Sequence, residues 1–87
     1  MYDLIFSPAF ARTAKKLKKK NRQLYEIIQK KAAELVVDPN RYKNLNYPYN
    51  NLKRVHIDTH FVLLFSVDEK AKTVTLEEFV HHDDAYK

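Results

Sequence analysis

An almost unbroken apolar run, Phe61-Val62-Leu63-Leu64-Phe65-Ser66-Val67, constrains the fold of this chain more than any other feature. A strand with one face in water alternates apolar and polar residues, whereas a strand covered on both faces reads as a continuous apolar run. Residues 61–67 are therefore predicted to form a central strand, buried on both faces of a sheet. The rest of the chain has to supply its neighbours.

Three further strands are predicted around this run. Residues 52–57 form one, and residues 73–80, which are rich in β-branched side chains, form another. The polar segment 68–72 supplies the turn that precedes residues 73–80, and residues 2–6 read as a short opening strand. Because the chain contains no glycine, we expect Asp and Asn to occupy any turn position that needs a positive φ.

Two amphipathic helices are predicted between the opening strand and residue 38. Ser7 and Pro8 suit the cap and the first turn of a helix that runs to about Lys19. After a turn at residues 20–21, a second helix ends at Asp38, because the following Pro39 disfavours helix in the residue before it. Residues 40–51, rich in Asn and Tyr, are expected to be an irregular loop. The apolar stripes of the two helices comprise Phe10, Ala14 and Leu17 in the first and Leu24, Ile27, Ile28, Ala32 and Leu35 in the second.

The element order β-α-α-β-β-β predicts an α+β fold, in which a helical hairpin packs on one face of a mostly antiparallel sheet. Eighty-seven residues suffice for one modest core, so residues 1–87 are expected to form a single domain. No apolar run approaches the ~20 residues that span a bilayer, and the first residues do not resemble a signal peptide. A soluble, cytoplasmic protein without membrane partners is therefore expected.

Two missing residue types exclude several chemistries. Without cysteine the chain has no disulfide framework, no thiolate nucleophile and no cysteine zinc site. Without glycine it lacks the glycine-rich loops that cradle nucleotide phosphates. Residues 12–31 carry nine Lys or Arg against the single acid Glu26, a segment charge of +8. Such a surface attracts RNA, DNA, anionic lipid or an acidic protein, although a merely solvated helix face is the alternative.

All four histidines lie in the last third of the chain. Histidine is the side chain whose ordinary pKa lies nearest neutral pH, so proton-transfer chemistry is expected there. If Val55 and Ile57 face the helices, Arg54 and His56 share the opposite face, because residues i and i+2 of a strand share a side. A guanidinium, imidazoles and aromatic rings on an open sheet face would suit single-stranded RNA. The alternatives are solvated histidines or a metal site, although adjacent histidines point apart and nothing fixes a tetrahedral ligand set.

The chain resembles the RelE/ParE superfamily of toxin–antitoxin toxins, in particular the RelE and YafQ ribosome-dependent mRNA endonucleases. The opening strand and the lysine-rich helical hairpin agree in order and length, and the similarity covers nearly the whole chain. The sharper match comprises His56-Ile57-Asp58, Phe61-Val62-Leu63-Leu64-Phe65 and Phe79-Val80-His81-His82-Asp83-Asp84-Ala85-Tyr86. YafQ-like toxins carry histidines at the places of His56 and His82, and aromatic residues at those of Phe61 and Tyr86.

The resemblance implies an endoribonuclease that cuts mRNA in the ribosomal A site and so inhibits translation, without a metal or other cofactor. The ribose 2′-OH would attack the adjacent phosphorus, leaving a 2′,3′-cyclic phosphate and a 5′-OH. His82 is then expected to be the general acid, and His56 a base or a phosphate-positioning group. Arg54 would stabilise the developing charge, and Tyr86 is the remaining residue of the expected catalytic set.

On the same resemblance, Lys43, Lys53, His60 and Phe61 are the further residues expected to contact RNA, beside Tyr86 of the catalytic set. Tyr86 and Phe61 would stack on or orient bases, and Lys43 and Lys53 would contact phosphate. His60 stands where YafQ-like relatives carry an acid, so its role in RNA binding is left open. Many RelE members place an arginine where this chain has Val62, so their arginine-dependent details do not carry over.

The resemblance also implies an acidic, RelB-like antitoxin that wraps the toxin as a hetero-oligomer and neutralises the basic segment. The ribosome, with mRNA in its A site, would be the second partner. Two other functions stay open. ParE-type relatives share the fold but poison DNA gyrase without catalysis, and they generally lack the histidine pair. The chain would otherwise be a plain RNA-binding or ribosome-binding module.

Overall fold

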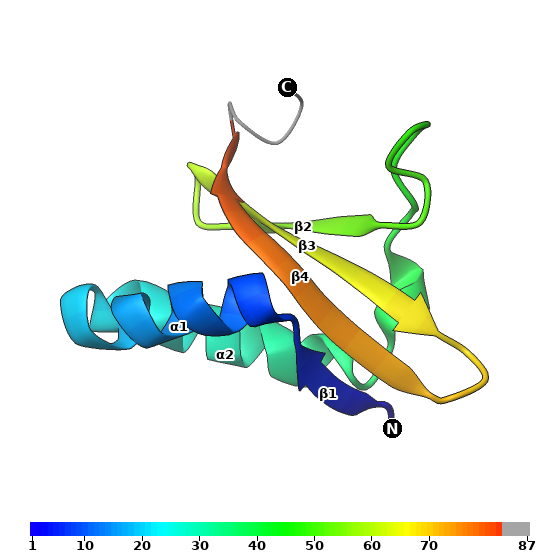
Figure 1. Ribbon diagram of the computed structural model, residues 1–87, viewed down its shortest axis with the longest axis horizontal. Helices are drawn as coiled ribbons and strands as arrows, with labels where there is room; N and C mark the ends of the chain where they lie inside the picture. The colour runs from blue at the N-terminus through cyan, green and yellow to red at the C-terminus, as the bar shows by residue number, and fades with distance from the viewer. Residues whose placement is uncertain (83–87) are drawn as a thin grey trace.

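The computed structural model describes residues 1–82, and Figure 1 shows their arrangement. In these residues two helices follow a short first strand, and three strands come after the helices, which confirms the predicted α+β order. The elements are β1 (Asp3–Phe6), α1 (Pro8–Lys20), α2 (Arg22–Leu35), the 3₁₀ turn η1 (Pro39–Arg41), β2 (Lys53–Ile57), β3 (Phe61–Asp68) and β4 (Thr73–His81). Within residues 1–82, neither helix is long and apolar enough to cross a membrane.

The four strands form one mixed sheet in the order β1-β4-β3-β2. The β2–β3 and β3–β4 pairs are antiparallel, as predicted, whereas β1 runs parallel to β4. A parallel pair requires a long crossover connection, and the helical hairpin forms part of it here. Both helices lie on the same side of the sheet (Figure 1). The other side, which we call the open face, carries no helix of the described chain.

The apolar run of residues 61–67 lies in β3, one of the two inner strands. Val62, Leu63 and Phe65 are fully buried and Leu64 is 5% exposed, so the strand is buried on both faces as predicted. Leu63 and Phe65 belong to the core that the sheet shares with the helices. Val62 and Leu64 alternate with them and therefore form an apolar floor on the open face.

Side-chain caps set where the helices begin. The Ser7 hydroxyl accepts a hydrogen bond from the Phe10 amide at 3.0 Å and donates one to the Glu77 carbonyl at 2.7 Å. Asn21 separates the helices and caps the second, its Oδ1 accepting from the Leu24 amide at 3.2 Å. The second helix ends at Leu35, three residues before the predicted Asp38. Asp38 has φ −147° and ψ 75°, outside the helical region that a following proline disfavours, and Pro39 starts a turn of its own.

Among residues 1–82, two turn residues have positive φ, Asp58 at 58° and Lys72 at 56°. Asp58 agrees with the expectation for a chain without glycine, but Lys72 contradicts it. The Lys72 ammonium lies 3.3 Å from Glu69 Oε2 and 5.2 Å from the centre of the Tyr2 ring, and these contacts hold the turn. Hydrogen bonds from Asn40 and Tyr2 hold the pKa of the Glu69 carboxyl below its ordinary value, and the bond to Glu69 raises the pKa of Lys72. This network ties the N-terminus and η1 to the β3–β4 turn.

Candidate functional site

The four histidines form two stacked pairs at one end of the sheet. The rings of His56 and His82 have centroids 5.6 Å apart and planes 25° apart. Those of His60 and His81 lie 6.1 Å apart, with planes inclined by 13°. The His82 amide donates a hydrogen bond to the His60 carbonyl at 2.7 Å, which ties the end of β4 to the β2–β3 turn. The neighbours His81 and His82 thus belong to different pairs.

The pair of His56 and His82 belongs to the open face. Val55 and Ile57 are buried in the helix-side core, at 5% and 0% exposed, so His56 and Arg54 point to the other side, as the alternation predicts. Residues paired on neighbouring strands form a row across the sheet, and one such row includes Arg54. Arg54 pairs with Leu64, which pairs with Glu78. The open face therefore combines two imidazoles and a guanidinium with the carboxylate of Glu78.

Sequence reasoning did not single out Glu78. The signal was nevertheless present, because Glu78 and Val80 alternate along β4 and share one side. His82, just beyond the last strand residue, continues this spacing and stacks on His56. The register then places Val80 in the row of His56 and Val62, next to the row of Glu78. A carboxylate thus lies on the same face as the histidine pair.

The geometry of the pair suits proton transfer at a phosphodiester. A general acid or base has to come within about 3 Å of the oxygen that it serves. Two imidazoles whose centres are 5.6 Å apart can each reach an oxygen of one phosphate group placed against them. Arg54 on the same face supplies the positive charge that a developing oxyanion needs.

Phe61 and Lys53 lie on the helix side, apart from this pair. Phe61 is in register with the buried Ile57, and its ring stacks on Phe79 at 4.9 Å between centroids. The Lys53 ammonium donates to the Tyr42 carbonyl and to Asn44 Oδ1, both at 2.7 Å, and so holds the loop that precedes β2. The structure therefore does not bring these two expected RNA contacts to the open face.

The other residues that the sequence predicts for the site lie in different parts of the chain. Lys43 is exposed in the loop before β2, and His60 is exposed in the second histidine pair. Tyr86 lies outside the described residues. In the part of the chain that the structure describes, no three His, Asp or Glu side chains converge as metal ligands would.

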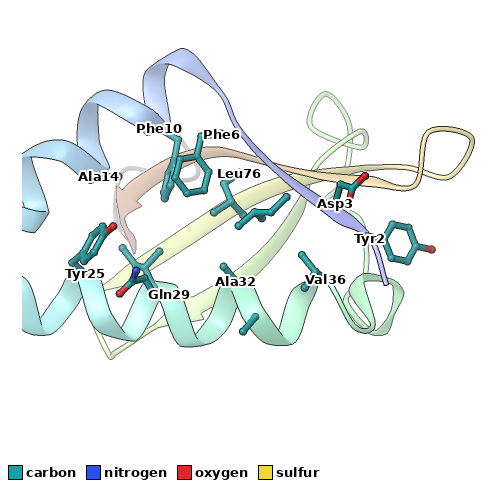
Figure 2. Close-up of a pocket in the computed structure, with 13 residues that line it drawn as sticks. Tyr2, Asp3, Phe6, Phe10, Ala14, Tyr25, Gln29, Ala32, Val36 and Leu76 are labelled. Atoms are coloured by element: carbon teal, nitrogen blue, oxygen red, sulfur yellow. The ribbon is translucent and has the colours of Figure 1, made fainter.

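An apolar groove of about 360 Å³ lies between β1, α1 and α2 (Figure 2). Leu4 and Phe6 line it and remain 40% and 47% exposed, and the Phe6 ring meets the edge of Phe10 with centroids 5.0 Å apart. Ala32 and Val36 of the second helix and its C-cap contribute the opposite wall. This apolar groove is lined by none of the four histidines.

A second hollow has a volume of about 540 Å³ and opens beside Glu78; we call it the polar groove after its charged lining residues Arg12, Glu77 and Glu78. The first turns of α1 form one wall, the residues just before β2 form the other, and the middle of β4 lies between them. Its lining residues are Ser7, Pro8, Ala9, Arg12, Asn51, Leu52, Glu77 and Glu78. The polar groove thus adjoins the row of Arg54 and Glu78 on the open face.

Known toxins share the fold of this chain. The family model of the ParE toxin of the type II toxin–antitoxin system parDE matches residues 4–86. A Methanocaldococcus jannaschii protein provisionally named toxin RelE4 is 45% identical over 87 residues, 100% of this chain and 93% of that protein. The chain belongs to the RelE/ParE superfamily and is a toxin of a type II toxin–antitoxin system, as its resemblance implied.

Solved structures support the same fold at low sequence identity. The toxin–antitoxin complex RelBE2 of Mycobacterium tuberculosis matches with a TM-score of 0.79 and 20% identity, covering 93% of this chain and 98% of that one. YafQ of Escherichia coli matches with a TM-score of 0.75 and 14% identity over 100% of both chains. The predicted RelE-like fold is thereby confirmed.

Proposed function

We propose that this toxin is a ribosome-dependent, metal-independent endoribonuclease that inhibits translation by cutting mRNA. The observation that supports the proposal is the stack of His56 on His82 beside Arg54 on the open face. The strand register brings together two groups able to exchange protons and one fixed positive charge, and cleavage by the neighbouring 2′-OH needs these components.

The proposed reaction is a transfer within the RNA strand. The 2′-oxygen forms a bond to the adjacent phosphorus while the bond from phosphorus to the 5′-oxygen breaks. His56 takes the 2′-OH proton or positions the phosphate, and His82 gives a proton to the departing 5′-oxygen. Arg54 stabilises the negative charge that builds up on the phosphoryl oxygens. The products are a 2′,3′-cyclic phosphate and a 5′-OH, so no water and no oxidant are consumed.

Mapping of mRNA 5′ ends tests this function. We expect induction of the toxin to produce cuts within translated reading frames, with 5′-OH ends that accept an adaptor only after treatment with a polynucleotide kinase. A matched mRNA whose start codon has been removed should remain intact, because it never enters the ribosomal A site. Cuts that are equally frequent in both mRNAs would contradict ribosome dependence, and an absence of cuts would contradict the proposed nuclease activity.

The description of the matching family model favours a second candidate, because it names ParE toxins. A ParE-like toxin would poison DNA gyrase without cleaving RNA, and the histidine pair would then have no catalytic task. A gyrase supercoiling assay with purified toxin distinguishes the two functions. Inhibition of supercoiling together with intact mRNA would show that the toxin is a gyrase poison and not a nuclease.

We further propose that an acidic antitoxin binds the helical hairpin and the apolar groove. RelBE2, which shares the fold, is a complex of toxin and antitoxin. In this chain, the segment of residues 12–31 with its charge of +8 flanks a groove that leaves Leu4 and Phe6 partly exposed. Strand β1 also forms an outer edge of the sheet. A partner with both acidic and apolar side chains complements such a surface.

Replacing Leu4 with Asp is expected to weaken binding to the antitoxin at least about tenfold, because it places a negative charge in the apolar groove. Calorimetric titration with the product of the adjacent gene measures the effect. Val37→Asp is the matched control, because Val37 is an apolar residue that is 63% exposed and lies outside the lining of the groove. Equal affinities of the two variants would contradict this docking surface.

A further inference from the structure

The polar groove adjoins the candidate site at the margin of the open face, where α1 begins beside β4. Glu78 shares a row with Arg54 and lies on β4, four residues before His82, which follows the last residue of that strand, His81. Because a strand rises about 3.3 Å per residue, the Cα atom of Glu78 is roughly 10 Å from that of His81, and His82 is the next residue. A single strand of RNA with its scissile phosphate at the histidine pair would therefore place a neighbouring nucleotide at the groove.

Two opposite charges line the polar groove from different elements. Arg12 comes from α1 and Glu78 from β4, and both side chains are exposed. Neither forms an ion pair with a residue among those that the structure describes. The adjacent Glu77 differs, because its Oε2 accepts a hydrogen bond from the Ser66 hydroxyl at 2.6 Å. Glu78 is thus the carboxylate of this groove that is available to a ligand.

The chemistry of these two charges fits a nucleotide of one kind. A guanidinium binds phosphate, and a carboxylate accepts two parallel hydrogen bonds from neighbouring donors. On its Watson–Crick edge, guanine presents two adjacent donors, N1–H and the N2 amino group. Adenine and cytosine present only an amino group there, and uracil presents only N3–H. The groove volume of about 540 Å³ lies within the range of about 300–1,000 Å³ that is usual for ligand sites.

We propose that the polar groove is a nucleotide subsite next to the cleavage site, in which Arg12 holds a backbone phosphate and Glu78 selects guanine. The inference rests on the proposed function, because it takes the RNA strand to run along the open face. Single-stranded RNA is commonly recognised through the Watson–Crick edges of splayed-out bases. Phosphate contacts carry no sequence information, so the choice of base falls to Glu78.

Binding of short, uncleavable RNA tests the subsite. Four 2′-O-methyl oligonucleotides, identical except for G, A, C or U at one position, are titrated into the wild-type protein and followed by NMR. The oligonucleotide with guanine is expected to bind most tightly, and Glu78→Gln to reduce its advantage about tenfold, within the range of a bidentate contact. Arg12→Ala should lower the binding affinity of all four oligonucleotides by similar factors.

The adjacent carboxylate supplies the matched control. Glu77→Gln should leave the preference for guanine unchanged, because the side chain of Glu77 is bound to Ser66. Equal binding of the four oligonucleotides by the wild-type protein would overturn the subsite, and a preference that persists in Glu78→Gln would overturn the role of Glu78. Because the probes lack a free 2′-OH, the result does not depend on cleavage. An absence of cleavage and an absence of selective guanine binding can therefore be told apart.

Discussion

Replacing His82 with alanine is expected to lower the rate of mRNA cleavage on translating ribosomes by a factor of about 10²–10⁴, the usual contribution of a general acid or base. The 5′-oxygen is a poor leaving group unless it gains a proton, and the variant removes the proposed donor. The loss should appear in the rate of the chemical step, measured in single turnover on ribosomes programmed with a defined codon. Growth inhibition should disappear in parallel.

His81→Ala is the matched control for this experiment. It removes the same kind of side chain at the neighbouring position, but His81 belongs to the other stack, with His60. The His81 variant should retain nearly full cleavage, and the thermal unfolding of both variants should resemble that of the wild type. If the two substitutions reduced cleavage equally, the assignment of His82 as the acid would be wrong. Full toxicity of a variant that lacks both His56 and His82 would contradict the proposed nuclease function.

The fold could be predicted largely because its main signals are local. Ser7 before Pro8 marks a helix start, and the run from Phe61 to Val67 marks a buried strand, whatever the rest of the chain does. The parallel pairing of β1 with β4 is a contact between the two ends of the chain, and no local pattern specifies it. Lys72 adopts positive φ in a turn held by contacts from Glu69 and Tyr2, and the latter is distant in sequence.

The candidate site could be predicted in part, for a related reason. Alternation along one strand is enough to place Arg54 and His56 on the open face. The stacking of His56 on His82 requires the register of three strands, since β3 separates β2 from β4. The position of Phe61 on the helix side also follows from register, through its partner Ile57. Sequence comparison with a family aligns residues but does not itself give the face on which each side chain lies.

The second large effect is expected from the core that holds the open face in place. Phe65→Ala should lower the free energy of unfolding by about 3–5 kcal/mol, the usual cost of truncating a buried phenylalanine. The side chain is fully buried, and its ring meets Tyr42 edge-on with centroids 5.8 Å apart. Native proteins are stable by only about 5–15 kcal/mol, so this one change removes much of the total. Urea unfolding followed by circular dichroism measures it.

Val37→Ala is the control for stability, because Val37 is 63% exposed and should cost less than about 0.5 kcal/mol. Phe65 is also in register with Lys53, the residue before Arg54, so a loosened core should disturb the open face together with the fold. The loss of cleavage in Phe65→Ala should therefore follow the unfolded fraction as temperature rises, whereas the loss in His82→Ala should persist where the protein is fully folded. An unfolding midpoint of Phe65→Ala equal to that of Val37→Ala would show that β3 is not the central buried strand. A chain without glycine and disulfides depends on that strand to align β2 with β4, and through them the histidine pair.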